Sequence, residues 1–102
     1  MYIVTNSTPE GNYTPSTFTN KDDAIKWMKE CSAYNIKAAF DYELEEEFGE
    51  EIYNEDFDID GNIEHILEYA KENLDVEISE DKIEIYYADD SYNILQLFEE
   101  TE

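Results

Sequence analysis

Arginine is absent from this sequence of 102 residues, and six lysines face 28 aspartates and glutamates. Arginine clamps phosphates with two parallel hydrogen bonds, and lysine supplies the point charges that neutralise DNA. A chain with a net charge of −22 and no arginine repels polyanions. We therefore expect no direct binding to nucleic acid or to an anionic lipid surface.

Glycine, cysteine and histidine are also scarce, with three, one and one residues. Three separated glycines do not make a glycine-rich phosphate loop. The single Cys31 excludes an internal disulfide and is typical of a reducing compartment. Cys31 falls on an apolar helix face, where we expect a buried thiol, and His65 falls on a polar face, so a catalytic cysteine–histidine pair is not expected. We predict that the protein is not an enzyme and uses no cofactor.

Long apolar runs are missing as well. No stretch approaches the roughly 20 apolar residues that cross a bilayer. The first residues, MYIVTN, lack the basic and long apolar segments of a secretory signal. These absences predict an intracellular protein, and the length predicts a single domain over residues 1–102.

Short β-branched and aromatic runs predict strands near both ends of the chain. A first strand is expected over Tyr2–Thr5, followed by a loop over residues 6–18, which are rich in serine, threonine and proline. Lys82–Ala88 and Tyr92–Phe98 are predicted to form a hairpin that turns at Asp89-Asp90-Ser91. A terminal helix capped by Ser91 is the alternative for the last element.

Helical spacing of apolar residues predicts two helices. Thr19 or Asn20 caps the first, which is expected to end near Ser32. The second begins at Asp60-Gly61-Asn62 and has about twelve residues. Their apolar stripes consist of Ala24, Trp27, Met28 and Cys31 in the first helix and Ile63, Ile66, Leu67, Ala70 and Leu74 in the second.

Residues 36–48 fit two patterns. Ile36, Phe40, Leu44 and Phe48 recur every four residues, as in a helix, whereas alternate residues from Ile36 to Leu44 are apolar, as in a half-buried strand. The alanine, glutamate and leucine content favours a helix that Gly49 ends. Together these elements predict an α+β fold, with two or three helices packed on one face of a small, mainly antiparallel sheet.

Negative charge is concentrated in the middle of the chain. Residues 1–37 contain four acids and four lysines, whereas residues 38–70 contain 13 acids and no lysine. Crowded carboxylates repel one another and destabilise the folded state, so this density indicates a function that benefits from it. We predict a partner-binding surface formed by Asp41, Tyr42, Glu43, Glu45, Glu46, Glu47, Glu50, Glu51, Tyr53, Glu55, Asp56, Phe57, Asp58 and Asp60.

One stretch within this region, residues 56–63, resembles the calcium loop of EF-hand and dockerin-type proteins. Acids occupy its positions 1, 3 and 5, and Gly61 occupies position 6. The bidentate glutamate that should close the loop is replaced by Leu67, and Glu68 comes one residue late. We therefore expect a solvated acidic turn and no metal site, with a small calcium-binding module as an alternative.

In size, charge and mixed α+β pattern, the chain resembles the phage-encoded DNA mimics that inhibit host defence nucleases, the anti-CRISPR and anti-restriction proteins. The resemblance is one of composition, and it transfers no individual residue. It implies a cytoplasmic inhibitor in a bacterial host cell that blocks the DNA-binding, PAM-reading cleft of a CRISPR effector or another nuclease. The alternatives are an immunity protein that neutralises a basic nuclease toxin and an acidic chaperone or activation segment.

Overall fold

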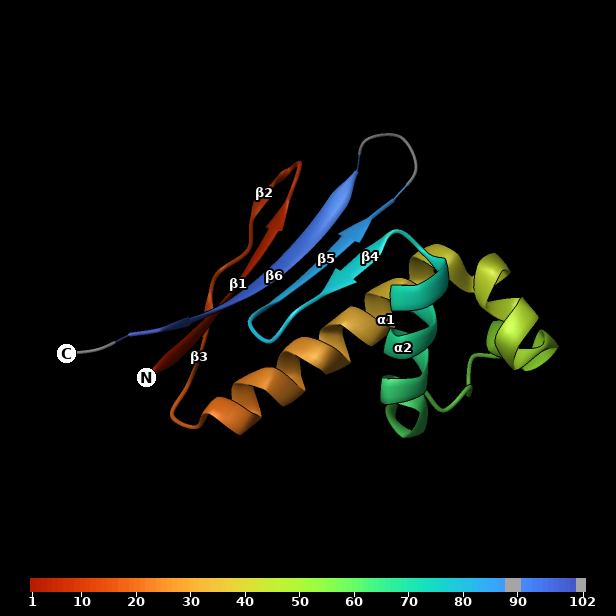
Figure 1. The fold of residues 1–102 in the computed structure, drawn as a ribbon, viewed down its shortest axis with the longest axis horizontal. Coiled ribbons are helices and arrows are strands. Elements are labelled where there is room, and N and C mark those ends of the chain that lie inside the picture. The colour runs from red at the N-terminus through yellow and green to blue at the C-terminus, as the bar shows by residue number, and fades with distance from the viewer. Residues whose placement is uncertain (88–90, 101–102) are drawn as a thin grey trace.

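A six-stranded antiparallel sheet forms one layer of the protein, and two α-helices form the other (Figure 1). The computed structural model describes residues 1–87 and 91–100 and confirms the predicted α+β fold. The strands run in the order β2-β1-β6-β5-β4, and β3 also pairs with β1. Their bounds are β1 Tyr2–Thr8, β2 Gly11–Asn12, β3 Ser16–Phe18, β4 Val76–Ile78, β5 Lys82–Tyr86 and β6 Tyr92–Glu99.

The predicted loop over residues 6–18 is wrong, because three strands lie within or reach into it. β1 continues to Thr8 since it pairs with β6 from Tyr2 opposite Glu99 to Ser7 opposite Ile94. Long-range pairing of this kind supplies backbone partners that the polar local sequence does not predict. The chain then folds back, and β2 and β3 add short edge strands to β1.

α1, Lys21–Phe48, is one long helix, so the predicted end near Ser32 is also wrong. The helical alternative for residues 36–48 is the correct one, and a kink at Phe40 separates the two parts. The Asn20 side chain caps the start by accepting a hydrogen bond from the Asp22 N–H at 2.7 Å. Gly49 ends the helix as predicted, at φ 79° and ψ −171°, a conformation that is almost confined to glycine.

α2, Ile63–Asn73, packs beside α1 on the same face of the sheet, as Figure 1 shows. Two short 3₁₀ helices, η1 Glu50–Tyr53 and η2 Asp60–Asn62, lie in the connection between α1 and α2. The C-terminal hairpin of β5 and β6 is confirmed, and its terminal-helix alternative is not observed. The predicted turn residues Asp89 and Asp90 lie outside the described residues. β4 was not predicted.

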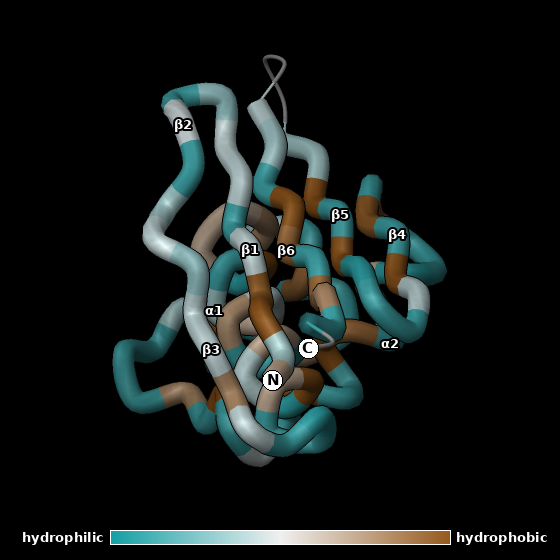
Figure 2. The backbone as a smooth tube through the Cα atoms, turned by 90° about the vertical axis from the view of Figure 1, so that its left-hand side faces the viewer, coloured by the Kyte–Doolittle hydropathy of each residue, from teal (hydrophilic) through white to brown (hydrophobic). Residues whose placement is uncertain are grey.

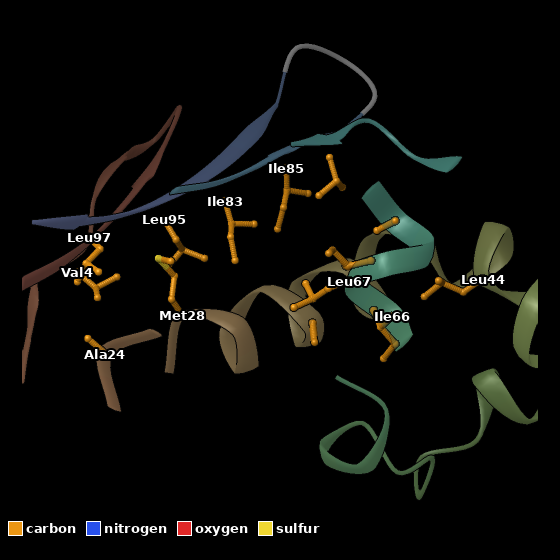
Figure 3. Packing of buried hydrophobic residues seen from close by; sticks show 14 of the residues in the cluster. Val4, Ala24, Met28, Leu44, Ile66, Leu67, Ile83, Ile85, Leu95 and Leu97 are labelled. Carbon is orange, nitrogen blue, oxygen red and sulfur yellow. The ribbon is translucent and has the colours of Figure 1, made fainter. Parts of the chain in front are cut away.

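The core lies between the sheet and the helices. Figure 3 shows side chains from β1, β5 and β6 pointing towards α1 and α2, and Figure 2 shows the hydrophobic segments gathered in β1, β4, β5 and β6. Each central strand buries alternate residues, which is the pattern of a sheet covered on one face. The labelled core residues are Val4, Ala24, Met28, Leu44, Ile66, Leu67, Ile83, Ile85, Leu95 and Leu97.

Candidate protein-interaction surface

Residues 41–60, which we call the acidic segment, run from the C-terminal half of α1 through η1 to the first residue of η2. Figure 1 shows the end of α1 and η1 beyond the edge of the sheet, at one end of the molecule. The chain then returns to the start of α2. The molecule measures 48 Å along its longest axis and 23 Å along its shortest. The acidic segment therefore forms a projecting end that a partner can approach.

The helical part of the segment exposes three glutamates, Glu43, Glu46 and Glu47. Residues three or four apart on a helix have Cβ atoms about 5–6 Å from each other, so these charges are close neighbours. Glu50 would continue this outward stripe at helical spacing, but α1 ends at Phe48 and Glu50 belongs to η1. The turn at Gly49 therefore displaces this fourth charge from the helical stripe.

The other predicted members divide by exposure. Glu51, Glu55, Asp56, Asp58 and Asp60 are exposed, whereas Asp41, Glu45 and Phe57 are half-buried. The Phe57 ring packs edge-on against Phe48, with 5.6 Å between the ring centroids. Phe57 thus supports the fold of the segment. Tyr42, which is 74% exposed, and Tyr53, which is 47% exposed, are the aromatic side chains available to a partner.

Two tyrosine hydroxyls tie the segment together. The Tyr53 hydroxyl donates to Oε2 of Glu45 at 2.9 Å, and the Tyr69 hydroxyl donates to the backbone oxygen of Glu43 at 3.3 Å. The hydrogen bond to the Glu45 carboxylate raises the pKa of Tyr53 to about 12. Burial and the nearby carboxylates, Glu46 first among them, raise the pKa of Tyr69. Both tyrosines therefore lie in the negative field of the segment.

Neutralising partners are scarce around the acidic segment. Within residues 1–87 and 91–100, the ion pairs of lysine are Lys26–Glu30, Lys29–Glu64 and Lys82–Glu84, all outside the segment. In this part of the chain, the one basic side chain within 4 Å of a carboxylate of the segment is His65, whose Nε2 lies 3.3 Å from Oε1 of Glu47 and pairs with it as an ion only when the imidazole is protonated. The carboxylates of the segment are therefore open to cations from another molecule.

His65 and Tyr69 also belong to this surface, although the sequence did not predict them as part of it. His65 is exposed, as predicted, but its ring also lies 4.5 Å from the Phe48 ring, centroid to centroid. The two residues are four apart in α2, so both reach the end of α1 from one helix face. The i, i+4 spacing of His65 and Tyr69 indicates that the two side chains share one face of α2. That this face contacts the end of α1 follows only from the packing of the two helices.

The calcium-like stretch is folded as a hydrogen-bonded turn. Oδ1 of Asp58 accepts from the Gly61 N–H at 3.0 Å, and Oδ1 of Asp60 accepts from the Tyr34 hydroxyl at 3.1 Å. A Cβ atom at Gly61 would overlap the Asp58 carboxylate, so a larger residue there would displace this hydrogen-bonded side chain. Leu67, at the closing position, is buried in the core. Among the residues that the structure describes, no group of three metal-ligating side chains is found.

Comparison of the chain with protein-family models, with curated proteins and with solved structures found no match. Neither helix of the described part of the chain is long and apolar enough to cross a membrane. The surface itself, with its exposed carboxylates, its two exposed tyrosines and its lack of lysine, is thus the basis for inferring a function.

Proposed function

We propose that the protein is an acidic DNA mimic that binds the DNA-binding cleft of a nuclease and blocks access of DNA. A bacterial defence nuclease is the expected partner, with the PAM-reading cleft of a CRISPR effector as the leading case, and the site of action is the bacterial cytoplasm. In this role the protein has no catalytic residue, and it acts by occupying the cleft stoichiometrically.

The observation that carries the proposal is the density of negative charge, without a lysine partner among the described residues, on a helical scaffold. Residues 41–47 contain five carboxylates, Asp41, Glu43, Glu45, Glu46 and Glu47. At a rise of about 1.5 Å per residue they span about 9 Å of α1, or roughly 2 Å per charge, close to the ~1.7 Å per charge of duplex DNA. Lysines and arginines that bind phosphates can pair with such carboxylates.

A competition assay tests this function. Labelled duplex DNA and a purified nuclease, either a guide-loaded CRISPR effector or a restriction enzyme, are titrated with the protein at two salt concentrations. The protein should displace the duplex, and the displacement should weaken at high salt, because attraction between exposed charges is screened. A stable complex of nuclease, protein and duplex together would contradict the proposal.

The matched variants separate local charge from total charge. Reversal of Glu46, Glu47 and Glu50 to lysine should slow association and abolish inhibition, because long-range steering and local pairing are both lost. Reversal of Glu72, Glu80 and Glu99, which are exposed and lie outside the segment, changes the net charge equally and should preserve most of the inhibition. If the first variant inhibits as well as the wild type, the mimic hypothesis fails.

A further inference from the structure

A row of three asparagine side chains connects β1, β6 and α1. Nδ2 of Asn35 donates to Oδ1 of Asn93 at 2.8 Å, and Nδ2 of Asn93 donates to Oδ1 of Asn6. Asn93 is only 4% exposed and alternates along β6 with the buried Leu95 and Leu97, so it occupies a core-facing position. A buried amide is tolerated there only because both of its ends are hydrogen-bonded.

This asparagine row has unused hydrogen-bonding capacity at both ends. Within the described part of the chain, Oδ1 of Asn35 and Nδ2 of Asn6 have no hydrogen-bond partner, although each lies in a half-buried residue. The buried side-chain polar atom without a partner in that part of the chain is Oγ of Ser32. The two ends of the row are therefore accessible, one as an acceptor and the other as a donor.

The three asparagines of the row line a cleft of about 460 Å³, which falls in the size range of ligand pockets. Tyr13, Tyr87 and Tyr92 are among the residues that line it. The backbone N–H of Tyr13 donates to the backbone oxygen of Asn6 at 3.0 Å, which ties the segment after β2 to β1 beside the cleft. The Tyr87 ring is held in place by stacking on the Phe40 ring, with 5.9 Å between the ring centroids. We call this site the amide cleft.

The composition of the amide cleft indicates the kind of ligand. Among the described residues, its lining consists of asparagine, tyrosine, serine, threonine and proline with a single ionised group, Glu10. Tyrosine, serine and asparagine are the residues that antibody loops use to contact proteins, because they combine rigid amphipathic surface with adaptable hydrogen bonds. The net charge of −22 disfavours a phosphorylated ligand. A side-chain amide also matches the donor and acceptor of a peptide group.

We propose that the amide cleft binds an extended, uncharged peptide segment of a protein partner, with a main-chain amide of the peptide bonded to Asn6 and Asn35. The inference rests on the proposed function only for the identity of that partner, which would be the nuclease. Asn35 precedes Glu45 by ten residues of α1, at most about 15 Å because the kink at Phe40 lies between them, so one protein can contact both surfaces. The acidic segment then attracts the partner electrostatically before contact, and the cleft adds uncharged contacts that salt does not screen.

The test uses a library of random dodecapeptides and the purified protein without any nuclease. The library should yield uncharged peptides that bind equally well at low and high salt. Asn93→Leu, which breaks the row, and Tyr13→Ser, which removes a ring that is 60% exposed, should each weaken these peptides about tenfold. Phe98→Ser removes a ring that is 46% exposed and does not line the cleft, and it should leave peptide binding unchanged.

Tyr13→Ser keeps the test valid even if Asn93→Leu perturbs folding, because Tyr13 is exposed and outside the core. The proposal is overturned if no peptide is enriched, or if the enriched peptides bind Tyr13→Ser as well as the wild type. Enrichment only of lysine-rich or arginine-rich peptides that dissociate at high salt would also overturn it, since it would assign binding to the acidic segment. Because no nuclease is present, these outcomes are independent of the competition assay.

Discussion

Tyr53 and Glu45 are joined by a 2.9 Å hydrogen bond that spans the turn at Gly49 and attaches η1 to the last turns of α1. Gly49 reinforces the turn through its own N–H, which donates to the Glu45 backbone oxygen at 2.8 Å. Glu45 therefore holds the turn through both its backbone and its side chain. These contacts fix the direction in which the chain leaves α1.

The Tyr53–Glu45 bond predicts a loss of stability at alkaline pH. The folded pKa of Tyr53 is raised from 10.0 to about 12, so its contribution is fully present below pH 10.0 and is lost as the pH rises through about 12. Tyr86, bonded to Glu84, has the same shift and adds to the effect. Urea unfolding across this range should show a shallower pH dependence in Tyr53→Phe, and shallower still in the double variant with Tyr86→Phe. An unchanged pH dependence in both variants would contradict the prediction.

Crowded carboxylates should make the fold more stable in salt. The Debye length falls from about 30 Å at 0.01 M to about 8 Å at 0.15 M ionic strength, which screens repulsion among exposed charges. We expect the melting temperature to rise over this range, and to rise less in the variant with Glu46, Glu47 and Glu50 reversed, because part of the repulsion is already removed. Thermal unfolding followed by circular dichroism measures both. A flat or falling curve for the wild type would contradict the expectation.

Ser32 offers a stabilising substitution. It is fully buried in α1, and its hydroxyl has no partner among the described residues. Ser32→Ala removes a desolvated hydroxyl and improves helix propensity, so unfolding should become roughly 1 to 2 kcal/mol less favourable. The control is Ser79→Ala, because the exposed Ser79 hydroxyl lies within hydrogen-bond distance of Asp81 and of the Lys82 backbone oxygen. That change should be neutral or slightly destabilising in the same urea titration.

Ser32 also shows where prediction from sequence stops. α2 was predicted well because its apolar stripe and polar face are unambiguous, and Ile66, Leu67 and Ala70 are buried as expected. The sequence predicts an end of the first helix near the polar Ser32, yet the buried stripe of α1 continues through Ile36 and Leu44. Local composition cannot distinguish a buried serine in mid-helix from a terminal one, because tertiary packing decides the difference.

The same limit applies to the candidate surfaces. The position of the acidic segment in the sequence was evident from the charges, but its projection beyond the sheet depends on the length of α1 and the turn at Gly49. The amide cleft gave no local signal, since pairing of the first and last strands brings Asn6 and Asn93 together and packing of α1 on the sheet adds Asn35. The separation of 87 residues between Asn6 and Asn93 places that contact beyond any local pattern.

Tyr42 provides a test of how a DNA mimic retains its partner. Its side chain is 74% exposed, and its hydroxyl has no hydrogen-bond partner in the described part of the chain, so truncation leaves the fold of the segment intact. A tyrosine packed at an interface acts after the encounter, whereas surface charge acts before it. On the proposed function, Tyr42→Ala should speed dissociation of the nuclease complex about tenfold and leave the association rate unchanged.

The contrast with Tyr53 makes this test sharper. Tyr53→Ala should also speed dissociation, but it additionally removes the hydrogen bond to Glu45, so part of its effect should come from the loosened turn. Tyr53→Phe keeps the ring and loses that bond, and the difference between the two Tyr53 variants isolates the packed ring. Association and dissociation rates measured for immobilised nuclease at two salt concentrations separate the contributions. If Tyr42→Ala changes only the association rate, the ring does not serve as an anchor, and charge alone must account for retention of the partner.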